Sequence, residues 1–157
     1  MDKIFGIFGM ITGSIGIIFS ILSYKNNKMQ AVATYFSIDK DLNFIEGRRI
    51  VYNLKPGEIV NESSPHRQKI SFVLNTFHAW ALLVKHKQLP LWVFYDKKMG
   101  ITSSGIAVIR TYKKLQPTIQ YYRKSNPKYA EYYEWLYNEI LKKCTDKEIK
   151  EIIRKLK

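Results

Sequence analysis

The sequence predicts an all-α protein with an N-terminal transmembrane helix, residues 1–26, followed by a basic helical bundle of about five helices, residues 27–157. Three observations carry this prediction. An uncharged apolar stretch opens the chain. Apolar residues then recur at the three- and four-residue spacing of helices. Residues that typically flank helices separate these segments, whereas strand patterns are scarce. We therefore expect one anchor and one compact domain.

The predicted anchor is the stretch from Ile4 to Tyr24, which contains no charged residue. As a helix it would be roughly 31 Å long, close to the thickness of the bilayer hydrocarbon. A cleavable signal peptide and a buried helix are the alternatives, but no small-residue cleavage site follows the apolar run. Lys25 and Lys28 come directly after it. The positive-inside rule therefore places the C-terminal domain in the cytoplasm.

Small and hydroxyl side chains recur along this predicted anchor. A spacing of three or four residues would let neighbouring helices pack closely, and the hydroxyl groups could line a narrow wet path within a ring of helices. Two alternatives stay open: transmembrane helices are rich in glycine in general, and hydroxyl groups can bond to their own helix. The candidate residues for an oligomer or pore helix are Gly6, Gly9, Thr12, Gly13, Ser14, Gly16 and Ser20.

The first half of the cytoplasmic part predicts two helices. Met29–Leu54 is expected to be helical, with a break or bend near Asn43 and Gly47, and to end before a Pro-Gly turn. Ser64 is expected to cap the next helix, with Pro65 at its first position. Apolar residues at helical spacing make that helix central to the core: Ile70, Val73, Phe77, Trp80, Ala81 and Val84.

The second half begins with a short aromatic segment, Leu91–Met99, after which we expect a helix over Thr102–Lys124 that is kinked at Pro117. Asn126, before a proline, is expected to start another helix. One face of that helix carries Tyr129, Tyr132, Tyr133, Leu136 and Ile140.

The last predicted helix begins with the capping-box pattern of Thr145 and Glu148. Its apolar residues recur at i, i+3, i+4 and i+7, with lysines on the other side. These residues are Ile149, Ile152, Ile153 and Leu156. Short polar turns join the predicted helices, as in a helical bundle.

The formal net charge of +13 favours phosphate-rich partners such as nucleic acid or anionic lipid. Residues 79–157 carry most of the excess. The single cysteine, Cys144, cannot form an intramolecular disulfide, and no Cys/His cluster has the spacing of a zinc site. We expect no cofactor and no metal.

Common catalytic motifs are absent from the sequence, including the P-loop and the nucleophile elbow. Helical ribonucleases of the HEPN type use an arginine followed by a histidine after four to six residues. Arg123 is the best-placed arginine, but Lys128, Tyr129 and Ala130 occupy those offsets. The three histidines of the chain are expected to be ordinary side chains. We therefore predict that the protein is not an enzyme.

Basic and aromatic side chains alternate around that arginine, at a predicted junction of two helices. Such a cluster could stack bases and neutralise phosphates, or bind lipid head groups. Tyrosines at helical spacing are also common as core residues with a surface hydroxyl, and this alternative stays open. The candidate residues for RNA or anionic-lipid contact are Tyr121, Tyr122, Arg123, Lys124, Lys128 and Tyr129.

Six segments carry a family resemblance: Val73–Ala81, Val84–Lys85, Leu89–Pro90, Leu115–Pro117, Tyr122–Arg123 and Tyr132–Leu136. They resemble a widespread bacterial family of helical proteins, each with one N-terminal membrane helix. Within that family, the chain is similar in size and layout to the small membrane accessory proteins of type VI-B CRISPR systems.

This resemblance implies a divergent HEPN-like bundle in the bacterial inner membrane that assembles into a pore and strengthens RNA-guided antiviral defence. Its partners would be membrane lipid, further copies of the chain, and RNA or an RNA-guided nuclease encoded nearby. Arg123 would occupy the HEPN arginine position, while the missing histidine puts nuclease activity in doubt. The alternative is a membrane-tethered RNA-binding or degenerate ribonuclease module.

Overall fold

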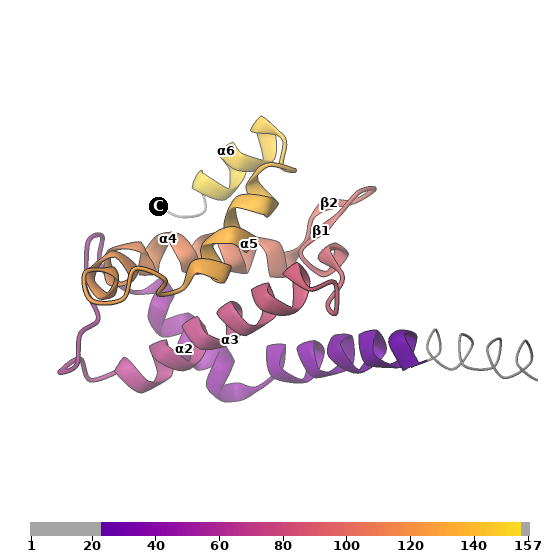
Figure 1. The fold of residues 1–157 in the computed structure, drawn as a ribbon. Coiled ribbons are helices and arrows are strands. Elements are labelled where there is room, and N and C mark those ends of the chain that lie inside the picture. Colours follow the sequence, from indigo (N-terminus) through magenta and orange to yellow (C-terminus); the bar gives the residue numbers. More distant parts are fainter. Residues whose placement is uncertain (1–22, 155–157) are drawn as a thin grey trace, which may run out of the picture.

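Helices dominate the computed structural model, which describes residues 23–154 (Figure 1). A first helical stretch, residues 23–39, leads into the bundle. The other elements are α2 (Leu42–Tyr52), α3 (Arg67–Lys85), η1 (Leu91–Val93), β1 (Tyr95–Asp96), β2 (Gly100–Ile101), α4 (Ser103–Arg123), α5 (Glu131–Leu141) and α6 (Asp146–Arg154). The predicted all-α bundle is thus confirmed for these residues.

The predicted anchor lies almost wholly outside the described residues, as do all seven candidate pore residues from Gly6 to Ser20. Within residues 23–154, no helix combines the length and the apolar character that a membrane crossing requires.

The helix predicted over Met29–Leu54 is broken earlier than the sequence predicts. The break falls at Lys40 and Asp41, because the Asp41 carboxylate caps α2. Its Oδ1 accepts hydrogen bonds from the backbone N–H groups of Asn43, at 2.8 Å, and Phe44, at 3.1 Å. Gly47 does not break the helix. A Cβ there would lie 2.6 Å from Val73 Cγ2, so the glycine allows α2 and α3 to approach closely.

Helix α3 is central, as predicted, but Ser64 does not cap it. The N-cap position is His66, which makes no side-chain capping bond. The Ser64 hydroxyl bonds instead with Asn61, accepting from its N–H at 3.1 Å and donating to its Oδ1 at 3.2 Å. Ser64 therefore stabilises a local turn instead of capping the helix as the sequence predicts. The apolar residues predicted for the core are all buried: Ile70, Val73, Phe77, Trp80, Ala81 and Val84.

Aromatic rings join the helices around α3. Tyr35 of the first helical stretch contacts Trp80 at a ring-centroid distance of 4.5 Å, and Phe44 of α2 contacts Trp80 at 5.1 Å. Phe77 stacks on Tyr133 of α5 at 5.2 Å. Such pairs add about 0.5–1.5 kcal/mol beyond the burial of their apolar area. The core thus holds helices from both halves of the chain.

The segment after α3 forms a small antiparallel hairpin that the sequence did not predict. Tyr95 pairs with Ile101 and Asp96 with Gly100. Strands of two residues are too short to show a recognisable alternation of apolar and polar side chains.

Helix α4 matches its predicted bounds, and the Thr102 hydroxyl caps it by accepting from Gly105 N–H at 3.1 Å. Pro117 lies inside α4, which continues past it. Helix α5 begins at Glu131 rather than after Asn126. The residues between form turns, and Ala130 at the N-cap adopts a positive φ of 57°.

The capping box of α6 is confirmed. Thr145 N–H donates to Glu148 Oε2 at 2.7 Å, and Glu148 N–H donates to Thr145 Oγ1 at 3.4 Å. Ile152 is buried and Ile149 is partly buried, as expected for the core side of this helix. The side chain of Ile153 and the whole of Leu156 lie outside the described residues.

Helices α3 and α4 run in opposite directions, which gives the bundle two ends (Figure 1). We call η1, the hairpin and the first turn of α4 the hairpin end. The last turn of α4 and the loop of residues 124–130 form the junction end. The residue-23 end of the first helical stretch points toward the same side of Figure 1 as the hairpin.

Candidate functional site

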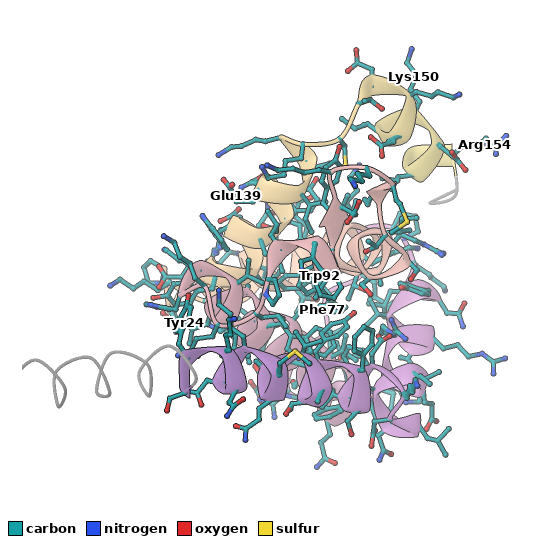
Figure 2. The ribbon with its side chains drawn as sticks, turned by 90° about the vertical axis from the view of Figure 1, so that its right-hand side faces the viewer. Tyr24, Phe77, Trp92, Glu139, Lys150 and Arg154 are labelled. Carbon is teal, nitrogen blue, oxygen red and sulfur yellow. The ribbon has the colours of Figure 1, made fainter. Side chains whose placement is uncertain are left out.

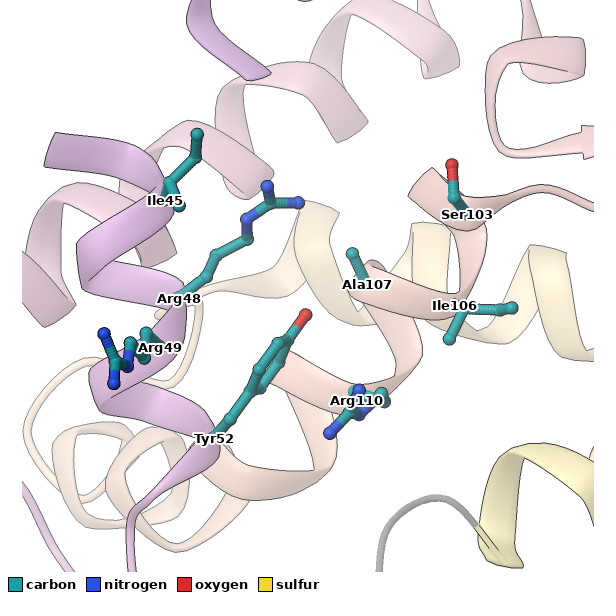
Figure 3. A pocket seen from close by; sticks show the side chains of 8 residues that line it. All are labelled: Ile45, Arg48, Arg49, Tyr52, Ser103, Ile106, Ala107 and Arg110. Atoms are coloured by element: carbon teal, nitrogen blue, oxygen red, sulfur yellow. The ribbon is translucent and has the colours of Figure 1, made fainter. Parts of the chain in front are cut away.

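A groove of about 330 Å³ lies between α2 and α4 (Figure 3). Each helix contributes side chains at i, i+3, i+4 and i+7, which share one helical face. Three of the eight lining residues are arginines. The lining from α2 is Ile45, Arg48, Arg49 and Tyr52, and the lining from α4 is Ser103, Ile106, Ala107 and Arg110. We call this feature the arginine groove.

Arg110 is held against Tyr52, with its guanidinium carbon 4.2 Å from the ring centroid. Its Nε atom is buried and has no hydrogen-bond partner. No acidic side chain in the described part of the chain forms an ion pair with Arg110 or with Arg49. An unpaired buried donor is costly, since folding removes water from it without replacing the hydrogen bond. One of the residues that line the groove thus holds a buried donor that lacks an acceptor.

Arg48 is the paired arginine of the groove. Its Nη1 lies 3.1 Å from Asp39 Oδ1, and its guanidinium lies 4.9 Å from the Phe44 ring centroid. The Asp39 carboxylate offsets one of the three positive charges. Because the lining contains no carboxylate of its own, the groove keeps an excess of two.

Ser103, the first residue of α4, lines the groove, so the beginning of this helix lies beside it. The first turn of a helix carries unsatisfied N–H groups and a partial positive charge, which adds to the field of the arginines. Guanidinium groups present planar pairs of donors that match the oxygens of phosphate or carboxylate. The lining holds no histidine, cysteine, aspartate or glutamate. The arrangement therefore suits anion binding.

Arg123, the best-placed arginine of the sequence analysis, forms hydrogen bonds within the protein. Its Nη2 donates to Glu134 Oε2 at 2.8 Å, and its Nε donates to the carbonyl of Tyr129 at 3.0 Å. The bonded guanidinium lowers the pKa of the Glu134 carboxyl. Tyr112 donates its hydroxyl to the other carboxylate oxygen at 2.8 Å. These contacts join α4 to α5 at the junction end.

The tyrosines of the predicted contact cluster also meet one another. The rings of Tyr122 and Tyr129 lie 5.1 Å apart, and Tyr121 contacts Tyr122 edge-on at 5.2 Å. The Tyr122 hydroxyl donates to Glu62 Oε1 at 3.2 Å. Lys124 and Lys128 are exposed on the same loop. The structure thus gathers the predicted residues at the junction end, and their contact with RNA or lipid stays a prediction.

The described residues contain no group of three side chains able to hold a metal ion. Burial lowers the pKa of His78, whose Nδ1 has no hydrogen-bond partner. Burial also raises the pKa of Cys144 to about 11, so this thiol is not ionised near neutral pH.

Sequence reasoning missed the arginine groove because its residues come from segments far apart in the chain. The sequence did contain one indication of this groove. Arg48, Arg49 and Arg110 share helical faces with apolar residues, a position in which an arginine needs a partner. The pairing of the two faces, however, requires the fold.

The family model described as "Domain of unknown function (DUF4760)" matches residues 8–140. Since this match covers most of the chain, the chain belongs to that family. No curated protein and no solved structure matches the chain. The matched range includes both helices that line the arginine groove.

Proposed function

We propose that this DUF4760 protein is a membrane-anchored, homo-oligomeric binding protein whose arginine groove takes the phosphate groups of a ligand. The observation that carries the proposal is the set of three guanidinium groups on one groove with a single carboxylate partner, Asp39. The proposed activity includes no catalytic step.

A phosphate-bearing ligand fits the groove better than a lone carboxylate. Arg49 and Arg110 form no ion pair in residues 23–154, and a phosphate can accept hydrogen bonds from both because it offers several oxygens. The volume of about 330 Å³ admits a nucleotide-sized group. Tyr52 offers an aromatic ring beside the charges. Aromatic and basic side chains together are typical of single-stranded nucleic-acid sites, so RNA is the ligand that we would test first.

The membrane part of the proposal is supported by the uncharged run from Ile4 to Tyr24 and by the lysines that follow it. The oligomer is supported by the small residues of that run, which would allow close helix packing. We propose that the N-terminal helices of several copies form a pore. By the resemblance to the accessory proteins of type VI-B CRISPR systems, this pore would act in antiviral defence beside an RNA-guided nuclease.

The groove is tested with full-length protein in mild detergent. Fluorescence anisotropy with labelled single-stranded RNA, with pyrophosphate as competitor, gives the affinity. Changing both Arg49 and Arg110 to Met should weaken binding roughly 100-fold, because each charge-assisted hydrogen bond contributes about 1.5–3 kcal/mol. Arg154→Met, at the exposed end of α6, is the matched control and should bind like the parent. An unchanged affinity and salt slope in the double variant would contradict groove binding.

The membrane part is tested by light scattering and electron microscopy of the same preparation, followed by dye release from liposomes. Gly9→Leu with Gly13→Leu should break up the oligomer and stop dye release, because large side chains separate the helices. Ile11→Leu, on the same segment, is the control and should change neither result. A monomeric parent that leaves liposomes tight would contradict the pore.

A further inference from the structure

A basic and aromatic patch covers the hairpin end, around a hollow of about 370 Å³. Its lining includes the 3₁₀ turn η1, the hairpin and Lys143, which follows the end of α5. We call it the hairpin patch and define it as five residues that line the hollow together with the exposed Met99, which follows Lys98 in the hairpin turn and lines a neighbouring hollow. The five are Trp92, Tyr95, Lys97, Lys98 and Lys143. None of these residues belongs to the arginine groove.

Two large apolar side chains of the hairpin patch face the solvent. Met99 is 82 % exposed and Trp92 is 50 % exposed. Figure 2 looks onto Trp92 from the hairpin side of the bundle. Tryptophan is enriched at protein and membrane interfaces, where its apolar ring is buried and its N–H group meets a polar partner or water.

The charge of the hairpin patch is positive. Lys97, Lys98 and Lys143 form no ion pair within the part of the chain that the structure describes. Of the carboxylates nearby, Glu148 bonds to Ile101 N–H and caps α6. Asp96 is engaged in the hairpin turn. Its Oδ1 accepts from the N–H groups of Lys98, at 2.7 Å, and Met99, at 3.0 Å. The lysine ammonium groups are therefore available to an anionic partner.

The hairpin that carries the patch is fixed to the bundle on two sides. The Thr102 hydroxyl donates to the carbonyl of Val93 at 2.7 Å. On the other side, Glu148 Oε1 accepts from Ile101 N–H at 2.9 Å, while the same carboxylate caps α6. The patch is thus preformed, so docking would not need to order a flexible loop.

We propose that the hairpin patch docks on the surface of an anionic lipid bilayer. Trp92 and Met99 enter the boundary between head groups and acyl chains, and the three lysines meet the anionic head groups. Charge complementarity supports this occupant, as does the place of the patch. The residue-23 end of the first helical stretch, which follows the predicted anchor, lies toward the same side of the molecule (Figure 1). The inference rests on one part of the proposed function, the N-terminal anchor, and goes beyond it because it requires neither a pore nor a ligand in the groove.

The test uses full-length protein in liposomes made with phosphatidylglycerol, whose lipids carry bromine close to the head group. Brominated lipid quenches only tryptophans at that depth. Trp92→Phe separates the signal of this residue from those of Trp80, which is buried, and Trp135, which is partly buried. The parent should be quenched and Trp92→Phe should not. Equal quenching of both proteins would overturn the proposal.

Two further variants test the role of charge. Lys97→Gln with Lys98→Gln should abolish most of the Trp92 quenching, as should liposomes of phosphatidylcholine alone. The matched control, Lys40→Gln with Lys55→Gln, removes the same charge from exposed positions outside the hairpin patch and should leave quenching unchanged. Full quenching in phosphatidylcholine would overturn the anionic-lipid proposal. So would the finding that lipid leaves Trp92 accessible to solvent and that only a soluble protein partner covers it. Groove affinity and dye release are separate measurements, so failure here is distinguishable from failure of the proposed function.

Discussion

Arg110 and Arg123 lie on the same helix, α4, but their guanidinium groups have opposite surroundings. Arg123 is bonded to the Glu134 carboxylate and to a backbone carbonyl, and its side chain is 25 % exposed. Arg110 lies on the Tyr52 ring with its Nε buried and unbonded. The paired arginine joins two helices, whereas the unpaired one faces a groove. The partners of an arginine, more than its sequence neighbours, therefore indicate whether it serves packing or binding.

The largest expected difference is in the ligand affinities of two matched variants, Arg110→Met and Arg123→Met. Arg110→Met keeps the aliphatic stem but removes the charge, and we expect RNA or pyrophosphate affinity to fall roughly tenfold or more, as for the loss of a charge-assisted hydrogen bond. Arg123→Met should change affinity less than twofold, since its donors already serve Glu134 and Tyr129. Titration of full-length protein in detergent measures both. A larger loss in Arg123→Met would favour the junction end as the binding site.

The unfolding free energy should respond in the reverse order, with the larger loss in Arg123→Met. Arg123→Met leaves the carbonyl of Tyr129 and one oxygen of Glu134 without their donors, which should cost about 1–2 kcal/mol of unfolding free energy. Arg110→Met loses the cation–π contact with Tyr52 but also removes a buried donor that has no partner. Because these two effects oppose each other, the unfolding free energy should shift by less than about 0.5 kcal/mol. Denaturant unfolding followed by tryptophan fluorescence gives both values. Equal losses would mean that the two arginines have the same structural role.

Much of the fold could be predicted, because the relevant signals are local. The bounds of α4 and the capping box of Thr145 and Glu148 are found where the sequence predicts them. The errors have local causes too. The Ser64 hydroxyl bonds to Asn61 instead of capping α3, and Asp41 breaks the first helix ahead of the expected position. One short polar side chain can serve either a turn or a helix, and the sequence pattern does not distinguish them.

The site could be predicted only in part. The cluster around Arg123 is contiguous in sequence, and the structure does bring its residues together. The missed groove joins Arg49 with Arg110, which are brought together only by the packing of α2 against α4. Nor did the sequence show that Glu134 pairs with Arg123, because a carboxylate eleven positions later in the chain is not a helical neighbour.

A smaller effect is expected from the ring that positions Arg110. Tyr52→Leu keeps an apolar side chain but removes the cation–π contact at 4.2 Å, a contact worth about 0.5–1 kcal/mol at an exposed site. Ligand affinity should therefore fall by about two- to fivefold, less than in Arg110→Met. Tyr52→Phe keeps the ring and is the control. If Tyr52→Phe weakens binding as much as Tyr52→Leu, the hydroxyl matters rather than the ring.

The smallest effect concerns acid stability at the junction end. Hydrogen bonding to Arg123 lowers the pKa of Glu134 below its ordinary value of 4.5. The stabilising contribution of the charged carboxylate is therefore complete above pH 4.5 and is lost as the pH falls through the lowered pKa. Because the Glu134 side chain is 39 % exposed, we expect this contribution to be only about 0.5 kcal/mol.

The parent should consequently lose stability with falling pH more steeply than Arg123→Met, in which the carboxyl has no guanidinium partner. Arg110→Met should keep the slope of the parent, because that arginine forms no ion pair within the described residues. Unfolding free energies of the three proteins at several pH values below 5 provide the measurement. Parallel curves for all three would show that the Arg123–Glu134 pair holds the two helices by geometry alone, without a net electrostatic contribution.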